Sequence, residues 1–336
     1  MGEIVLEVTD LQIDYKIEDK ELPVVQNINF IVEKGKTLGI VGESGCGKSV
    51  TASSIMQLLP KGIGKITNGQ ICFQGKDIAK LTEKEMQQIR GNEISMIFQN
   101  PMTSLNPVYK IGNQLMEILR AHEKISRKEA YQKSVDMLKK VGIPEAERRM
   151  KEYPHQLSGG MRQRVMIAMA LSTNPSLLIA DEPTTALDVT IQAQVLSLIE
   201  QLQKDYQTAC LFITHDMGVI AEIADYVLVM YAGNVVEYDT VEGLFSNPIH
   251  PYSRGLLQSI PRSDRDVEKL YTIKGVVPML GELPKGCKYQ DRCSSCIQKC
   301  REQTPPLMTL SSGKKVACWI YAGEEGGVMN ESLTRR

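Results

Sequence analysis

Short apolar runs alternate with longer amphipathic segments over the first two thirds of the chain. The uninterrupted apolar runs, each bounded by polar residues, are 37–41, 177–180 and 209–213. Runs of this length are typical of strands buried on both faces of a parallel sheet. The apolar residues between the last two runs repeat at helical spacing, at Ile191, Val195, Leu198 and Leu202. The order strand, helix, strand therefore predicts an α/β fold with a parallel core.

Other segments flank this predicted core. Apolar and polar residues alternate over 5–8, which favours an edge strand. Residues 49–60 have the pattern of a helix that ends at Pro60. Residues 100–165 interrupt the strand rhythm with a mostly helical insertion.

A change in composition marks a boundary near residue 246. Pro248, Pro251 and Pro261 follow one another closely there, and such spacing is typical of a connecting segment. We therefore predict two domains, residues 1–245 and residues 246–336.

The charge balance argues against nucleic-acid binding. The 336 residues include 39 Lys and Arg and 40 Asp and Glu, for a formal net charge of -1, whereas nucleic-acid coats need a basic footprint. Aromatic residues make up 5% of the chain, which is too few for a base-stacking surface. No apolar run reaches the ~18 residues of a membrane span, and the acidic N-terminus does not resemble a secretory signal. We expect a soluble protein in the cytosol.

A glycine-rich loop follows the first apolar run. Residues 42–49 read GESGCGKS and match G-x-x-x-x-G-K-[ST] between a strand and a helix. Its backbone N–H groups can turn toward phosphate oxygens, Lys48 can reach the β- and γ-phosphates, and Ser49 can bind Mg²⁺. The alternative is a glycine-rich turn without a ligand. The candidate nucleotide-binding residues here are Gly42, Glu43, Ser44, Gly45, Cys46, Gly47, Lys48, Ser49 and Val50.

Two carboxylates follow the second apolar run. Asp181 and Glu182 lie at the predicted carboxyl end of a buried strand, where open α/β sheets bind ligands. Asp181 would hold Mg²⁺ through water, and Glu182 would polarise the attacking water as general base. Alternatively, the two carboxylates only cap the next helix.

A second candidate anion site lies in the sequence LSGGMRQR, residues 157–164. Ser158, Gly159 and Gly160 begin a predicted helix whose free N–H groups can bind an anion. The alternative is an ordinary N-cap formed by Ser158. Gln99 and His215 each follow an apolar run, and each alone is more often structural than catalytic.

Together these residues closely resemble the ATPase subunit of an ABC transporter. The resemblance rests on the order of phosphate loop, Gln99, LSGGMRQR, Asp-Glu-Pro and His215, and it covers essentially the whole chain. It implies an ABC-type P-loop ATPase with a RecA-like core, an antiparallel β subdomain and a helical signature subdomain at about residues 100–165. It also implies that two ATP molecules lie between two such subunits.

The same resemblance implies a role for each site residue. Tyr15 stacks on the adenine, Gln99 contacts Mg²⁺ and the water, and His215 contacts the γ-phosphate. The signature residues bind the nucleotide that the opposing subunit's phosphate loop holds, and Asp188 touches that subunit. The segment after Gln99, residues 100–115, would contact the membrane chains; alternatively it is an ordinary surface loop.

The C-terminal part narrows the resemblance. Residues 247–257, NPIHPYSRGLL, resemble the extension of ATPase subunits of oligopeptide, dipeptide and nickel importers, and the cysteine-bearing form resembles the D-type subunit. This implies an F-type ATPase partner, two membrane permeases, an extracellular substrate-binding protein and a place at the cytoplasmic face of the membrane. ATP-driven import of di- or oligopeptides is the expected function, with nickel import as the alternative.

Five cysteines lie in the last 50 residues. In a reducing compartment such a group more often binds metal than forms disulfides. Their spacing alone does not separate a [4Fe–4S] cluster from Zn²⁺ or from free thiols. Resemblance to the D-type subunits implies a small cysteine-rich extension and favours an iron–sulfur cluster in it. The implied ligands are Cys287, Cys293, Cys300 and Cys318, and Cys296 is an extra thiol.

Two other classes of function stay open. A soluble ABC ATPase of DNA repair or translation usually has two cassettes or a long coiled coil, and the sequence has neither. An iron–sulfur sensor would use its ATPase for regulation, so that Cys300→Ser would change signalling.

Overall fold

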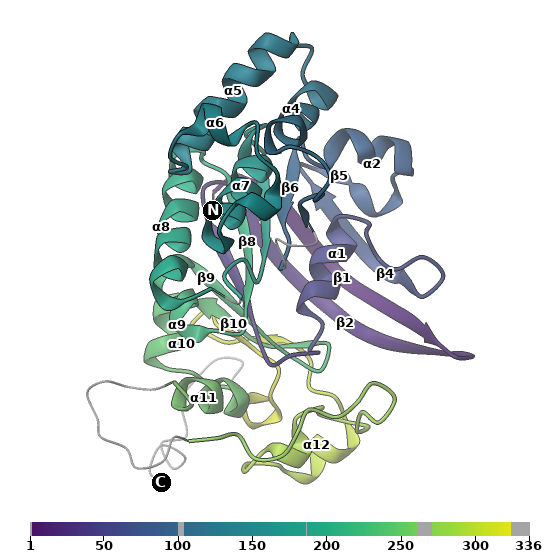
Figure 1. Ribbon diagram of the computed structural model, residues 1–336. Helices are drawn as coiled ribbons and strands as arrows, with labels where there is room; N and C mark the ends of the chain where they lie inside the picture. The colour runs from purple at the N-terminus through teal and green to yellow at the C-terminus, as the bar shows by residue number, and fades with distance from the viewer. Residues whose placement is uncertain (1, 100–103, 186, 261–270, 324–336) are drawn as a thin grey trace.

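The computed structural model describes residues 2–99, 104–185, 187–260 and 271–323. Figure 1 shows a central sheet with helices along one side, long antiparallel strands on the other, and a helical part at one end. Helices α11 (Pro251–Gln258) and α12 (Gln298–Glu302) lie at the opposite end of the molecule. The predicted α/β architecture is confirmed.

The central sheet is mostly parallel. Its strands lie in the order β11 (Met308–Thr309), β12 (Lys315–Val316), β10 (Asn234–Thr240), β9 (Tyr226–Tyr231), β3 (Thr37–Val41), β8 (Ala209–Thr214), β7 (Leu177–Asp181) and β6 (Ile94–Ile97). The five strands from β9 to β6 run parallel. Every residue of β3, β7 and β8 is buried, as the uninterrupted apolar runs predict.

Two apolar cores cover the two faces of this sheet. On one face, alternate residues such as Phe212 pack with apolar residues of α7 (Gly159–Leu171), α8 (Val189–Tyr206) and α9 (Met217–Ile223). On the other face, neighbours such as Leu211 pack with α1 (Lys48–Ile55) and with the antiparallel strands. The predicted stripe on residues 191–202 is confirmed, because it faces the first core.

Helix α1 is shorter than predicted. It ends at Ile55 and not at Pro60, because Gln57 adopts a left-handed conformation with φ 48°. The N–H of Leu58 then bonds to the carbonyl of Ser53 and closes the helix. The side-chain amide of Gln57 donates to the carbonyl of Ile78, which holds the turn.

The antiparallel sheet corrects the prediction of an edge strand at residues 5–8. These residues belong to β1, which pairs with two strands and lies inside the sheet. One partner, β2, follows directly along the chain, but the other, β4, lies some distance away in the sequence. Alternation alone therefore cannot separate an edge strand from an inner strand with one exposed face. The strands of this sheet lie in the order β2 (Lys20–Glu33), β1 (Ile4–Ile17), β4 (Gly64–Phe73) and β5 (Lys76–Asp77). Along the chain, β5 is followed by η1 (Ile78–Lys80) and α2 (Glu83–Ile89).

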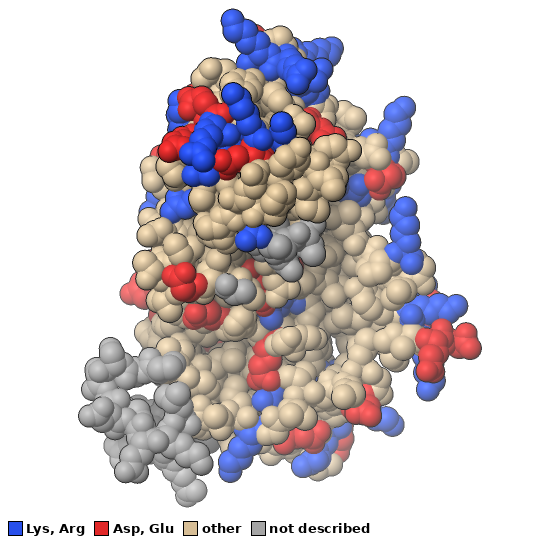
Figure 2. All heavy atoms as spheres, viewed as in Figure 1, with Lys and Arg blue, Asp and Glu red and all other residues tan. Residues whose placement is uncertain are grey.

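The insertion is mostly helical, as predicted, over its described residues. It contains α4 (Ile111–His122), α5 (Arg127–Lys140), α6 (Ala146–Arg149) and the turn η2 (Pro154–Gln156). Ser126 and Glu129 form a capping box at the start of α5, which satisfies free N–H groups there. Within the parts of the chain that the structure describes, no helix combines the length and the apolar character that a bilayer span needs. Figure 2 shows acidic and basic side chains mixed over the helical part of this face.

The C-terminal segment joins the central sheet. Strand β12 pairs with β10 through Glu237 and Val316. The Glu237 carboxylate is fully buried and accepts hydrogen bonds from the N–H groups of Ile249 and His250, both at 2.9 Å. The remaining helical elements are α10 (Val241–Ser246), η3 (Gln290–Arg292), α12 (Gln298–Glu302) and η4 (Trp319–Tyr321).

Candidate nucleotide-binding site

The loop 42–47 connects the buried strand β3 to helix α1. Gly45 and Gly47 have φ angles of 79° and 102°, a left-handed region that glycine adopts without strain. Gly42 is required for a different reason, because a Cβ there would lie 2.2 Å from the carbonyl oxygen of Met230. The backbone therefore turns tightly at the carboxyl end of β3, as a phosphate-binding loop requires.

Lys48 lies against the inside of this loop. Its side chain is buried, and its Nζ donates to the carbonyl oxygens of Gly42 at 2.8 Å and Glu43 at 3.1 Å. The ammonium group is thereby held at the loop, at the N-terminus of α1. An incoming phosphate would meet a positive charge that is already in position.

Ser49 and Asp181 meet at the neighbouring strand end. The Ser49 hydroxyl donates to Asp181 Oδ1 at 2.9 Å, and Asp181 is the last residue of β7. Burial raises the pKa of the Asp181 carboxyl, and the hydrogen bond from Ser49 offsets part of that rise. A hydroxyl and a carboxylate are hard oxygen ligands, so this pair fits Mg²⁺.

Glu182 gathers the other predicted catalytic residues. Its Oε2 accepts from Gln99 Nε2 at 2.8 Å and from the Thr185 hydroxyl at 2.9 Å, and its Oε1 lies 3.3 Å from His215 Nδ1. Burial would raise the pKa of Glu182, but the hydrogen bonds from Thr185 and His215 outweigh it, so the pKa is lowered. The carboxylate is therefore ionised at neutral pH and can accept a proton from water.

The signature residues begin helix α7. The Ser158 hydroxyl accepts from the N–H of Met161 at 3.3 Å, so it is an N-cap, and Ser158 and Gly159 are exposed. A Cβ at Gly160 would lie 3.1 Å from Ile191 of α8. Further along α7, the Gln163 amide donates to the carbonyl of Pro183 and links the helix to the strand end that carries Glu182.

Tyr15 and Asp188 lie on other elements. The Tyr15 ring on β1 is half-buried, and a Cβ at Gly64 would lie 2.8 Å from it. Asp188 is exposed and caps α8 by accepting from the N–H of Ile191 at 3.0 Å. The structure thus joins Ser49 with Asp181 and joins Glu182 with Gln99 and His215, whereas the side chains of Ser158 and Asp188 cap their own helices.

Sequence reasoning missed three residues that hold this site. Thr185 donates a hydrogen bond to Glu182, and Gln163 donates one to the carbonyl of the next residue, Pro183. Arg292 donates to the phosphate-loop residue Glu43 at 2.9 Å. Only Thr185 had a signal, since it follows Glu182 by three residues within one turn. Arg292 lies 249 positions from Glu43, so no local pattern could connect them.

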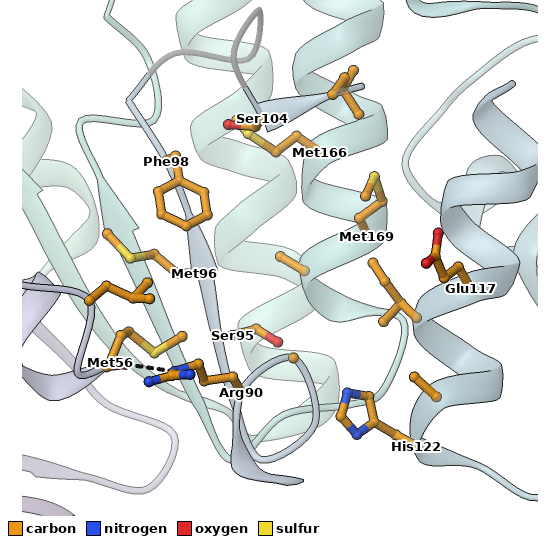
Figure 3. Close-up of a pocket in the computed structure, with 16 residues that line it drawn as sticks. Met56, Arg90, Ser95, Met96, Phe98, Ser104, Glu117, His122, Met166 and Met169 are labelled. Atoms are coloured by element: carbon orange, nitrogen blue, oxygen red, sulfur yellow. Dashed lines mark hydrogen bonds between the residues drawn. The ribbon is translucent and has the colours of Figure 1, made fainter. Parts of the chain in front are cut away.

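A pocket of about 440 Å³ (Figure 3) is lined by Phe98, the residue that directly precedes Gln99 in the chain. Met96 and Phe98 from β6 and the residue that follows it, and Met166 and Met169 from α7, contribute to its lining. Ile118 of α4 also lines it. Phe98 is 41% exposed, so an apolar ring is open to solvent next to the catalytic segment. Residues 100–103 of the predicted membrane contact lie outside the described residues.

The expected metal site at the C-terminal cysteines has no support in the residues that the structure describes. Among the described residues, no group of three or more His, Cys, Asp or Glu side chains is placed to hold a metal ion, and the cysteines are free thiols. Burial raises the pKa of Cys287 to about 11 and that of Cys318 to about 12. Without a metal ion these two thiols are therefore protonated at neutral pH, and a metal would have to displace their protons.

The fold and the site together define a phosphate-loop ATPase of the ABC class. The family model described as "ABC transporter" matches residues 25–185, and the model "Oligopeptide/dipeptide transporter, C-terminal region" matches residues 236–300. The oligopeptide transport ATP-binding protein AppD of Bacillus subtilis (strain 168) is 53% identical over 96% of this chain and 98% of its own length. OppD of Salmonella typhimurium strain LT2 is 51% identical over 94% of this chain and 93% of its own length.

Solved structures agree with this. The dimeric, post-hydrolysis structure of the ATP-binding cassette MJ0796, bound to ADP and Pi, matches with a TM-score of 0.63 and 26% identity. The match covers 70% of this chain and 98% of the MJ0796 chain. The chain therefore belongs to the ABC transporter ATP-binding proteins that carry the oligopeptide/dipeptide transporter C-terminal region. Members of this family are ATPases coupled to transport.

Proposed function

We propose that this chain is the ATPase subunit of an importer of di- or oligopeptides. The observation that carries the proposal is the meeting of Ser49 with Asp181 and of Glu182 with Gln99 and His215 at adjoining strand ends. The relatives AppD and OppD are named for oligopeptide transport, which favours peptides over nickel and over a soluble role in DNA repair or translation.

In this proposal the loop from Gly42 to Val50 binds the phosphates and Tyr15 binds the adenine. Ser49, Gln99 and Asp181 would hold Mg²⁺, which when bound neutralises charge on the β- and γ-phosphates. Glu182 accepts a proton from the attacking water, and His215 stabilises the charge of the γ-phosphate.

The exposed signature residues Ser158 and Gly159, with Gly160 and Asp188, would act on the nucleotide of a second subunit. Free N–H groups at the start of α7 suit an anion, while Lys48 and Ser49 lie on another helix. We propose an F-type homologue as that second subunit. ATP binding closes the pair, and the contacts formed on closure shift the permeases between two states.

The transport proposal is tested with the chain purified in complex with its permeases and reconstituted in vesicles. We expect ATP-dependent uptake of a labelled oligopeptide in the presence of an extracellular binding protein, and no uptake of Ni²⁺. ATP-dependent Ni²⁺ uptake would instead support the alternative, and a chain that purifies without membrane partners would contradict the proposal.

We propose that the pocket lined by Phe98 receives a short helix of a permease at the cytoplasmic face of the membrane. Its methionines and the exposed ring of Phe98 suit an apolar helix, and Phe98, which directly precedes Gln99 in the chain, would pass movement to the catalytic residues. Phe98→Ser should reduce the amount of co-purified permease, while ATP binding by the chain is retained. Ile297→Ser is the matched control, because Ile297 is 45% exposed and does not line the pocket.

We also propose that Cys287, Cys293, Cys300 and Cys318 hold a [4Fe–4S] cluster, with Zn²⁺ as the alternative. What supports this is the presence of five cysteines within the last 50 residues and the hydrogen bond that the Cys287 N–H donates to the Cys300 carbonyl at 2.7 Å. Metal binding would have to displace the thiol protons. Iron, sulfide and zinc analysis of anaerobically purified protein decides between the metals, and metal-free protein contradicts both.

We keep the predicted organisation of residues 1–245 as the ATPase domain and 246–336 as the C-terminal extension. One family model matches residues 25–185, inside the first part, and the other matches residues 236–300, which begins within β10 and crosses residue 246.

A further inference from the structure

The C-terminal segment holds the phosphate loop at Glu43. The guanidinium of Arg292 donates to Glu43 Oε2 at 2.9 Å, and the Tyr252 hydroxyl accepts from the Glu43 N–H at 2.9 Å. The carbonyl of Glu43 in turn accepts from Lys48 at 3.1 Å. The side chain and the backbone N–H of one loop residue are thus bonded to residues from the C-terminal extension.

Arg292 is itself firmly held. Its side chain is 6% exposed, its Nε donates to the carbonyl of Lys274 at 2.9 Å, and its guanidinium lies 5.6 Å from the ring centre of Tyr231 and 5.9 Å from that of Tyr289. A buried cation without a partner is costly. The pair with Glu43 therefore has one geometry, set by the surrounding rings.

Tyr252 has a similarly fixed position. Its side chain is fully buried, and its ring centre lies 4.8 Å from that of Tyr231 and 5.3 Å from that of Tyr289. Tyr231 of β9, Tyr252 of α11 and Tyr289 thus form one tyrosine cluster, and Tyr289 belongs to the cysteine segment, residues 287–300. Because Glu43 stands between Gly42 and Ser44, fixing Glu43 fixes the direction of the loop's backbone.

We infer that Arg292 and Tyr252 are positioning residues that hold the phosphate loop in its binding shape and thereby set the affinity for ATP. A loop that is ordered before its ligand arrives loses less entropy on binding. The inference rests on the proposed role of the loop in phosphate binding. It assigns the extension a part in nucleotide binding that does not depend on whether its cysteines carry metal.

The test is an equilibrium titration of the full-length chain with a fluorescent ATP analogue. Arg292→Ala should weaken binding of the analogue about tenfold, a size usual for coupling between connected sites. Tyr252→Phe should also weaken binding. Tyr252→Phe removes only the hydroxyl and keeps the ring in the tyrosine cluster. Arg301→Ala is the matched control, because Arg301 is an exposed arginine of the same segment, on α12.

A double-mutant cycle separates positioning from simple support of the fold. If Arg292 acts through Glu43, Arg292→Ala should add little to the loss of affinity caused by Glu43→Gln. Arg292→Lys should restore part of the affinity. The inference is overturned if Arg292→Ala lowers the melting temperature but leaves the affinity for the analogue unchanged, or if the two losses are additive. Failure of the wild-type chain to bind the analogue would instead overturn the proposed function, and this inference with it.

Discussion

The backbone of Glu182 adopts a left-handed conformation that the surrounding sequence does not predict. Its φ angle is 46°, a left-handed value that costs about 1–3 kcal/mol for a residue with a side chain. This turn lets the carboxylate meet Gln99 and His215, which come from two other segments. The motifs predicted which residues would meet, but they did not indicate the strained turn or the bond from Thr185.

Replacing Glu182 by Gln tests its role as base. The amide keeps the size of the side chain but cannot take a proton, so we expect hydrolysis to fall by about 10²–10⁴-fold while ATP binding persists. Phosphate release and ATP titration on the purified complex measure the two quantities. Glu222→Gln, on the exposed side of α9, is the control, and steady hydrolysis by Glu182→Gln would contradict the assignment.

At the scale of single elements, helix α11 depends on a buried histidine. His250 caps its N-terminus by accepting from the N–H of Tyr252 at 3.1 Å. Burial, with a further effect of Arg254, lowers the pKa of His250 to about 3. The sequence identified residues 247–257 by resemblance, but burial of this imidazole depends on the packing of α11 against β10 and the cysteine segment.

The pH dependence of stability follows from this histidine. Its pKa is about 6.5 in the unfolded chain and lower when folded, so the unfolded state binds the proton first. The free energy of unfolding should therefore decrease as pH falls below about 6.5, by about 1.4 kcal/mol per unit, until about pH 3.

The variant His250→Asn offers an amide oxygen in place of the capping Nδ1 but cannot titrate, so its stability should fall less steeply over this window. Chemical unfolding at several pH values measures both slopes. Burial raises the pKa of the neighbouring Glu237, and comparing the two proteins cancels most of that contribution. Equal slopes would contradict the prediction.

At the scale of the whole molecule, the C-terminal segment shares both sheet and core with the ATPase. Strand β12 extends the central sheet through β10, and Tyr252 and Tyr289 pack against Tyr231 of β9. These contacts join residues that lie far apart in the chain. The proline-rich change in composition near 246 indicated a boundary, but it could not indicate how much surface the two parts bury against each other.

Truncation measures this dependence. A chain that ends at residue 245 loses both N–H donors to the buried Glu237 carboxylate and exposes the edge of β10. Because a buried carboxylate without partners is destabilising and an open strand edge promotes association, we expect a lower melting temperature and aggregation. A chain that ends at residue 323 keeps every described contact and is the control. Equal melting temperatures would mean that the segment folds as an independent unit.

The sequence by itself determined the nucleotide chemistry of this protein. Phosphate binding needs glycines, Lys48 and Ser49 at fixed spacing within one strand, loop and helix, so the signal is local and survives without a structure. The buried parallel strands were also readable, because burial on both faces removes polar residues from the run. Contacts between distant segments were decided by the tertiary structure alone. The pairing of β1 with β4, the bond from Arg292 to Glu43 and the burial of His250 all depend on packing that brings remote residues together. No spacing along the chain encodes these contacts.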